Sequence, residues 1–160
     1  MAAETEGVPP APDKFHRELA SLKDKLLELA RLAEQAMERS VSAFLKRDEN
    51  LALQIIKGDK AVNELEETID GDCVRLIALF QPVAIDLRQL MAVDHISAEL
   101  ERLGESATNI AEEVLALKDL PPEPAHPELP QMARDVQEMV RQSLLAFLRR
   151  ELLASHSRTR

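Results

Sequence analysis

The sequence has no tryptophan and no tyrosine, and it has only four phenylalanines among its 160 residues. A core of useful size must therefore be built from Leu, Ala, Val, Ile and Met, within a hydrophobic content of 45%. Such a composition favours helices over sheets. The length fits one domain, or one domain plus part of another. The composition therefore predicts an all-α fold.

The sequence also lacks a second cysteine, so Cys73 cannot form an internal disulfide. Within an apolar helical row, this thiol is expected to be a small buried hydrophobe in a reducing cytosol. Residues 1–13 carry acids and prolines where a secretory signal would carry a basic patch and an apolar run. No run of about 18 uncharged apolar residues occurs, so no segment is expected to span a bilayer. We expect a cytoplasmic protein with a disordered lead-in at residues 1–13.

Basic residues are fewer than acidic ones: the sequence has 20 Lys and Arg residues and 29 Asp and Glu residues, which gives a net charge of −9. This balance argues against a nucleic-acid partner. A phosphate-cradling glycine loop and a recognisable nucleophile setting are both missing. The Glu and His three apart that a di-iron oxidase bundle requires occur only as Glu123 and His126, in a proline-rich segment. The class of di-iron oxidases is therefore disfavoured.

Three long amphipathic stripes follow one another, beginning near Phe15, Leu51 and Val93. In each, apolar residues recur at alternating spacings of three and four, as they do on one face of a helix. Breaks near residues 47–50 and 80–82 are short, and a short connection makes consecutive helices antiparallel neighbours. We expect an up-down-up three-helix bundle over residues 14–118, with Pro82 restarting the chain in a first helical turn.

A proline-rich linker is expected at residues 119–130, and an internal repeat follows it. SVSAFLKRD at residues 40–48 is echoed by SLLAFLRRE at residues 143–151. We expect a fourth helix at residues 131–153 that begins an incomplete second bundle, and then a tail at residues 154–160.

This fourth helix would expose an apolar face, which needs cover. Its apolar residues are Met132, Val136, Met139, Val140, Leu144, Phe147 and Leu148. The helix could fold back over the first bundle or be exchanged with another subunit, and we expect a homodimer or a larger species.

Acidic residues follow the second and third stripes. Asp59 and Leu103 are equally far from a hinge near residue 81, so Asp59 is expected to lie level with Glu101 and Glu105. Asn63 and Glu66 would lie one turn closer to the hinge. Crowded carboxylates repel one another, and a cation relieves the repulsion. These oxygen ligands suit Mg, Mn or iron better than Zn. The alternative is that these carboxylates simply face water.

Two further charged residues lie just after Pro82. Asp86 can favour the helix N-terminus, and Arg88 can pair with an acid of the facing helix end, such as Asp72. The alternative is a corner at which Asp86 and Arg88 contact a partner protein.

Four segments resemble the PhoU family of phosphate-signalling regulators. They are FHRELASLKDKLLEL from residue 15, DKAVNELE at residues 59–66, QPVAIDLR at residues 81–88 and ELERLGESATNI at residues 99–110. The resemblance implies a cytoplasmic all-helical protein of two tandem three-helix bundles, and a protein that is not an enzyme. Its implied role is to restrain phosphate uptake and the phosphate-starvation response, by contact with the ATP-binding subunit of the phosphate transporter and with a membrane sensor histidine kinase.

The resemblance also implies dimers and metal clusters on acidic motifs of the form Asp or Glu, three residues, Asp. Here these motifs fall on Asp59 to Asn63 and on Glu101 to Glu105, and both depart from the pattern at their second member. The ending departs as well, so we expect a chain truncated in its second repeat. Two alternatives stay open: a metal-binding helical bundle, and a non-functional remnant of the family.

Overall fold

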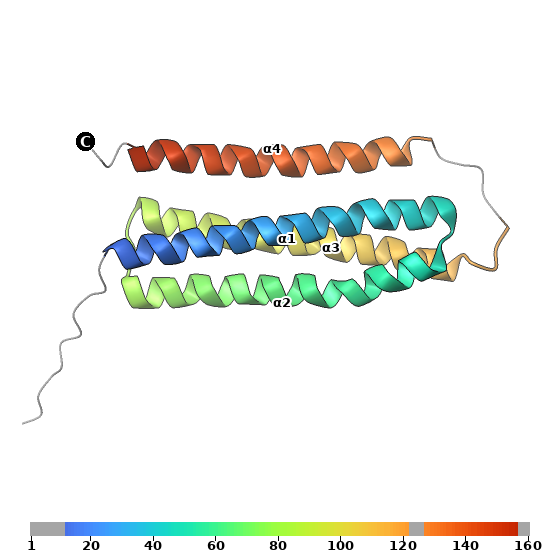
Figure 1. Cartoon of the computed structure of the whole chain (residues 1–160), viewed down its shortest axis with the longest axis horizontal. Helices are drawn as coiled ribbons and strands as arrows, with labels where there is room; N and C mark the ends of the chain where they lie inside the picture. Colours follow the sequence, from blue (N-terminus) through green and yellow to red (C-terminus); the bar gives the residue numbers. More distant parts are fainter. Residues whose placement is uncertain (1–11, 122–126, 157–160) are drawn as a thin grey trace, which may run out of the picture.

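The computed structural model describes residues 12–121 and 127–156, with side chains over residues 14–121 and 127–149. In these ranges every regular element is an α-helix (Figure 1). The four helices are α1 (Pro12–Lys46), α2 (Glu49–Phe80), α3 (Ile85–Ala116) and α4 (Leu129–His156). None of them contains a stretch long and apolar enough to cross a membrane. The prediction of an all-α fold is confirmed.

Helices α1, α2 and α3 run up, down and up, as predicted (Figure 1), and their apolar stripes meet in a main core and in a smaller cluster near the α1–α2 connection. The core is largely aliphatic, as the composition requires. Its fully buried large side chains include Leu26, Leu29, Ile69, Leu76, Leu90 and Val93. Cys73 is buried as expected, and its burial raises the thiol pKa to about 12. Ser40 occupies a slot of the α1 stripe, where its hydroxyl donates to the Met37 carbonyl at 2.9 Å.

The connections are tighter at one end of the bundle than at the other. Only Arg47 and Asp48 separate α1 from α2, and the Asp48 carboxylate caps α2 by accepting from the Leu51 N–H at 3.0 Å. At the opposite end, residues 81–84 separate α2 from α3. The expectation that Pro82 lies in the first turn of the third helix is therefore wrong. Gln81 ends α2 with φ 46°, and Ala84 adopts φ 49° directly before α3.

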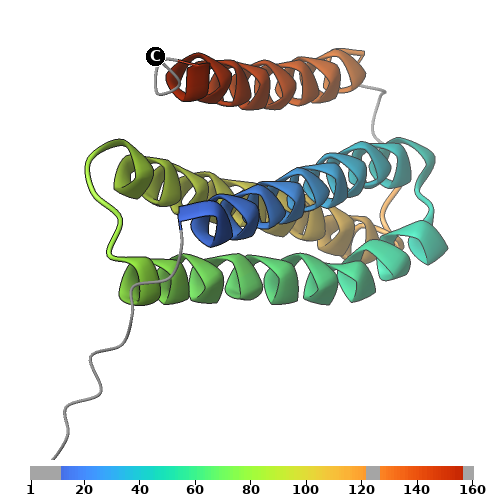
Figure 2. The ribbon, with the colours of Figure 1, turned by 60° about the vertical axis from the view of Figure 1, so that its left-hand side comes forward.

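Helix α4 lies along α1, on the side away from α2, in both ribbon views (Figure 2). Leu144 joins the main core and is 8% exposed, while Val140 and Phe147 pack partly against that core. Of the two arrangements that the sequence left open, the structure has the one in which the fourth helix folds back. Met132 and Met139 stay 58% and 61% exposed.

The helix boundaries differ by a few residues from the predicted segments. Helix α1 begins at Pro12, inside the expected lead-in, because proline is well suited to a first helical turn. The same preference lets α4 begin at Leu129, with Pro130 as its second residue. Helix α4 also continues to His156, past the expected start of the tail. Residues 1–11, 122–126 and 157–160 lie outside the described part.

Helices α2 and α3 lie close together at Gly104. A Cβ added there would lie 3.0 Å from the Val62 Cγ1, which is 3% exposed and stiff because valine is β-branched. We expect Gly104→Val to lower the free energy of unfolding by about 1–3 kcal/mol, because the helices would have to separate. Urea unfolding followed by circular dichroism measures the change.

Gly58 supplies the control, since nothing lies within 4 Å of a Cβ added at this exposed position of α2. Gly58→Ala should raise the free energy of unfolding by about 0.5–1 kcal/mol through helix propensity alone. A Gly104→Val protein as stable as the wild type would show that α2 and α3 are not held this closely.

Candidate functional site

The predicted ligand Asp59 lies in a small polar group between α2 and α3. Its Oδ2 accepts a hydrogen bond from the Asn63 Nδ2 at 3.2 Å, and its Oδ1 accepts from the Thr108 hydroxyl at 3.1 Å. The Asn63 Oδ1 is buried without a hydrogen-bond partner in the described structure. Both Asp59 oxygens are thus engaged by neutral donors.

A second set of residues, the acidic group, lies closer to the α2–α3 connection and consists of Glu66, Asp70, Asp94 and Glu101. Burial raises the pKa of Glu66, and the negative charges of Asp70, Glu101 and Asp94 raise it further. Three of these carboxylates are half-buried, and Asp70 is exposed. Repulsion among like charges is therefore a feature of this part of the α2–α3 interface.

The observed register corrects the predicted one. Asp59 lies level with Thr108, and Val62 lies level with Gly104, so Asp59 is about one turn away from the predicted level of Glu101 and Glu105. The cause is the connection at residues 81–84, which starts α3 later than a hinge at residue 81 would. Glu101 instead lies close to Glu66.

The five predicted ligands therefore do not form one site. Asp59 pairs with Asn63, Glu66 faces Glu101, and Glu105 is exposed. Within the described residues, no group of three or more His, Cys, Asp or Glu side chains is arranged to hold a metal ion. With the side chains as they lie, the structure does not fit a resident metal cluster, and metal binding stays a prediction.

Two members of the acidic group, Asp70 and Asp94, were missed by the sequence analysis. A simple signal could have found both. Asp70 follows Glu66 by four residues, and Asp94 precedes Glu101 by seven, so each pair shares one face of its helix. The predicted site was centred on Asp59, whose level along the bundle differs from the predicted one.

The expected ion pair between Arg88 and Asp72 is wrong. Asp72 pairs with Lys25 of α1 and with Arg75, which also reaches Glu18 of α1 at 2.8 Å. Burial alone would raise the pKa of Asp72. The hydrogen bonds from Lys25 and Arg75 together have the larger effect, so the pKa of Asp72 lies below its ordinary value. The reason is again the register, which places Arg88 closer to the end of the bundle than Asp72.

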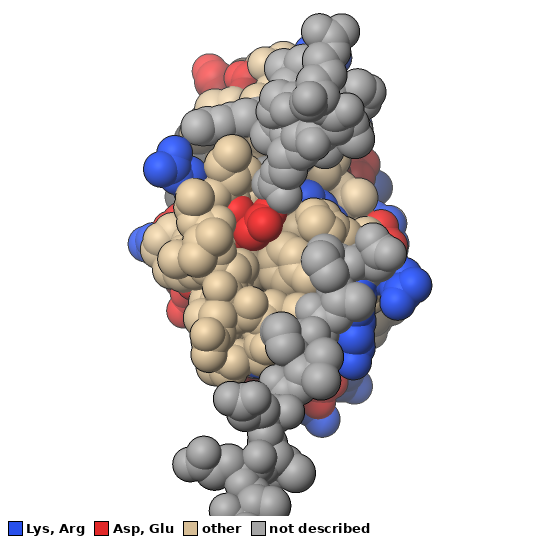
Figure 3. Space-filling view, turned by 90° about the vertical axis from the view of Figure 1, so that its left-hand side faces the viewer, with Lys and Arg blue, Asp and Glu red and all other residues tan. Residues whose placement is uncertain are grey.

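The remaining predicted residues belong to the α2–α3 corner, which we define as Leu79, Val83, Ala84, Ile85, Asp86 and Arg88. Its apolar members are unusually open, since Leu79 is 55% exposed, Val83 75% and Ile85 46%. Figure 3 views this end of the molecule, where uncharged side chains form a broad area with acidic atoms near its centre and with Lys and Arg at its margins.

The charged members of the corner lie in the first turn of α3. Asp86 is half-buried, and its N–H donates to the Val83 carbonyl at 3.2 Å. Its carboxylate lies at the positive end of the helix dipole, as predicted. Arg88 is exposed and has no ion pair with any residue that the structure describes. Its guanidinium is therefore open to an acidic group from outside the chain.

The backbone of the corner is strained. Ala84 has φ 49° and ψ −107°, a combination that residues with a Cβ rarely adopt. Such conformations cost on the order of 1–3 kcal/mol and cluster at binding sites. Strain next to open apolar side chains makes the corner the strongest candidate for a partner-binding surface.

Comparison with known proteins identifies one family. The PhoU domain matches residues 26–114, which contain most of the three-helix bundle and the whole α2–α3 corner. The crystal structure of the phosphate transport system regulatory protein PhoU from Streptococcus pneumoniae is 32% identical in sequence, with a TM-score of 0.74. That superposition covers 82% of this chain and 62% of the pneumococcal chain.

Two curated relatives are described as accessory proteins of the phosphate-specific transport system. The PhoU homolog of Aquifex aeolicus (strain VF5) is 36% identical over 88% of this chain, and PhoU of Escherichia coli (strain K12) is 34% identical over 87%. The matched regions span 63% and 58% of those relatives' own lengths. The chain thus spans about three fifths of each relative.

The raised pKa of Glu66 and the lowered pKa of Asp72 predict opposite effects of pH on stability. Ionised Glu66 destabilises the fold above the pKa of its unfolded state, so Glu66→Gln should raise the melting temperature at pH 7. Ionised Asp72 stabilises the fold in that range, so Asp72→Asn should lower it. We expect changes on the order of 2 °C in circular dichroism melts.

Both differences should shrink as the pH is lowered to about 3.5, below the pKa of an unfolded glutamate or aspartate. Glu66, with its raised pKa, is then protonated in the folded and the unfolded protein, and the stabilisation by Asp72 declines as the pH falls toward its lowered pKa. Melts of the wild type and both variants at the two pH values provide the control. Equal melting temperatures for Glu66→Gln and the wild type at pH 7 would contradict the crowding of the acidic group.

Proposed function

The chain belongs to the PhoU family, and from this premise we propose that it regulates phosphate-specific transport and phosphate-starvation signalling by protein contact. The printed descriptions of its relatives, as accessory and regulatory proteins of phosphate transport, support this function. In the proposal the chain acts in the cytoplasm as a negative regulator. It lowers phosphate uptake and restrains a sensor kinase, and it performs no catalysis.

The proposed partners are the ATP-binding subunit of the phosphate transporter and a membrane sensor histidine kinase. The observation that carries the contact mechanism is the α2–α3 corner. Burying Leu79, Val83 and Ile85 in a complex would contribute about 25 cal/mol for each Å² of apolar surface removed from water. Arginine is enriched among the residues that supply most of the binding energy of interfaces, so the position of Arg88 beside this apolar surface fits a contact site.

Arg88 can fix the orientation of a partner at this surface through an ion pair. Because it is exposed and lacks an internal ion pair among the described residues, it can meet a carboxylate of the partner with little rearrangement. The strained connection at Ala84 holds Val83 outward in the unbound chain. The corner is thus arranged before binding, which reduces the entropy lost on association.

A second candidate function is metal binding, and one observation favours it. The carboxylates of the acidic group raise the pKa of Glu66, and a divalent or iron cation would relieve that repulsion. The side chains would have to turn toward a common point, since they do not converge in the described structure. The cation would hold α2 and α3 together at this level.

The regulatory function predicts a phenotype in the cell that encodes the chain. Deleting the gene should raise alkaline phosphatase activity when phosphate is plentiful, and the wild-type gene should restore repression. Val83→Asp and Arg88→Glu should fail to restore it, because they place negative charge in the contact surface. Alkaline phosphatase activity measured with ample phosphate gives the readout.

Leu53→Asp is the matched control, since Leu53 is 45% exposed at the far end of α2. It should restore repression as well as the wild type does. A deletion strain with normal repression would oppose the regulatory function and favour a non-functional remnant. Full repression by folded Val83→Asp and Arg88→Glu proteins would contradict the α2–α3 corner as the contact surface, but it would leave the regulatory function standing.

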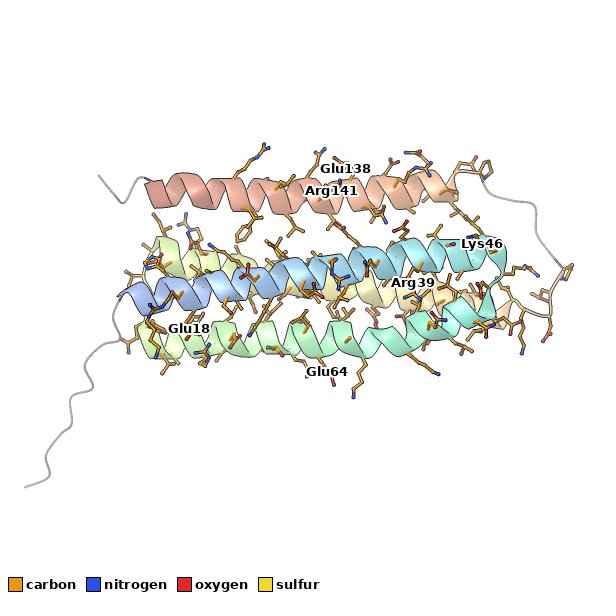
Figure 4. The ribbon with its side chains drawn as sticks, viewed as in Figure 1. Glu18, Arg39, Lys46, Glu64, Glu138 and Arg141 are labelled. Carbon is orange, nitrogen blue, oxygen red and sulfur yellow. The ribbon has the colours of Figure 1, made fainter. Side chains whose placement is uncertain are left out.

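Metal binding predicts that protein loaded with Mn²⁺ or Fe²⁺ and then desalted keeps the ion, as measured by plasma mass spectrometry. A Glu66→Gln, Glu101→Gln double variant should lose it. Glu64→Gln should keep it, because Glu64 is exposed and pairs with Lys60 away from the acidic group (Figure 4). Wild-type protein without bound metal after loading would remove this candidate.

A further inference from the structure

Two stretches that are far apart in the sequence meet at one end of the bundle. They are the α1–α2 connection at Arg47 and Asp48, and the segment that follows α3, residues 117–121. Helix α4 begins at this same end (Figure 1). The Arg47 guanidinium joins the two stretches, because its Nη1 donates to the Leu120 carbonyl at 2.6 Å and its Nη2 donates to the Pro121 carbonyl at 3.1 Å.

The backbone at Arg47 has a conformation that favours glycine. Its φ of 53° lies in the left-handed region. The Arg47 N–H donates to the Phe44 carbonyl at 3.3 Å, and the Asp48 N–H donates to the Ala43 carbonyl at 2.9 Å. This pair of hydrogen bonds commonly ends a helix, and glycine is the usual residue at the position that Arg47 occupies. Glycine would form this turn with less strain but would reach neither carbonyl of the segment after α3, which indicates a role for the arginine side chain.

Arginine is well suited to this contact. Its planar guanidinium carries several N–H groups in a fixed arrangement, so one side chain binds two successive carbonyls at once. Hydrogen bonds from a charged donor are stronger than those between neutral groups. Arg47 is also exposed, so its two hydrogen bonds can open without disturbing the core. The contact therefore opens and closes separately from the unfolding of the bundle.

The contact shortens the connection that leads to α4. Fully extended, a chain from Ala116 at the end of α3 to Leu129 at the start of α4 would reach about 45 Å. From Pro121, which Arg47 holds, the reach to Leu129 is at most about 28 Å. The shortened connection also starts beside the end of α1, the helix on which α4 packs. Arg47 therefore favours the arrangement in which α4 lies along α1.

We propose that Arg47 is a latch that holds the segment after α3 at the α1–α2 connection and thereby keeps α4 against α1. The latch is closed in the structure, with both hydrogen bonds made. When it opens, residues 117–121 separate from the α1–α2 connection and α4 is free to move away from α1, while the three-helix core stays folded. Arg47 is thus a positioning residue. The latch uses no residue of the α2–α3 corner or of the acidic group.

Hydrogen exchange measured by mass spectrometry on the full 160-residue chain tests the latch. Arg47→Gly fits the backbone conformation better and removes the side-chain contact. Amide exchange should become about fivefold faster in residues 117–121 and in the first turns of α4, a factor typical for the loss of one hydrogen bond. The melting temperature should not fall, because glycine relieves the strain of the turn between α1 and α2.

A second variant and a matched control accompany this measurement. Arg47→Asn lacks the extra backbone freedom of glycine, yet asparagine also adopts the left-handed conformation, so it should accelerate exchange in the same two segments. Arg39→Ala is the control. Arg39 is likewise an exposed arginine of this half of α1 (Figure 4), but its guanidinium donates to the Gln54 side chain of α2 at 2.7 Å. Arg39→Ala should leave exchange in both segments unchanged.

Three results would overturn the latch. The first is exchange at the wild-type rate in residues 117–121 of both Arg47 variants. The second is faster exchange in that segment with no change in α4, because Arg47 would then not position this helix. The third is a lower melting temperature together with faster exchange throughout α1, α2 and α3, which would assign Arg47 to the stability of the whole fold.

Discussion

The register between α2 and α3 is the constraint on which the rest of the structure depends. It is set by the contact of Gly104 with Val62 and by the connection at residues 81–84, which delays the start of α3. This register brings Glu101 to Glu66 and Thr108 to Asp59. It also carries Arg88 beyond the reach of Asp72, which leaves the guanidinium at the open corner of the bundle. The contact and the connection together thus determine which charges are paired.

Periodicity alone predicted the helices and their buried faces, because a stripe recurring every three or four residues fixes which side of a helix is apolar. It placed Leu26, Leu29 and Cys73 in the core, and they are there. It could not fix the register. Gln81 and Ala84 take positive φ values that glycine or asparagine would have signalled, and alanine gives no such signal. An error of about one turn then moved every predicted contact between α2 and α3.

The element that packs against a helix is harder to predict than the side of the helix that is apolar, and α4 illustrates why. The repeat showed that its apolar row resembles that of α1, yet a pattern states what kind of surface is present and not what packs against it. In the structure, Leu144 enters the core beside α1, while Met132 and Met139 stay in solvent. The family assignment, in contrast, followed from the sequence alone, since QPVAIDLR and ELERLGESATNI are specific enough to identify it.

The chain's single thiol has a practical consequence. Cys73 lies within the core, its hydrogen directed to the Leu90 carbonyl, and with a pKa of about 12 it holds almost no thiolate at neutral pH. Maleimide reagents therefore have no reactive target on the folded protein. One introduced surface cysteine would carry a fluorophore without background, so a change in its surroundings on partner binding becomes measurable without first removing the native residue.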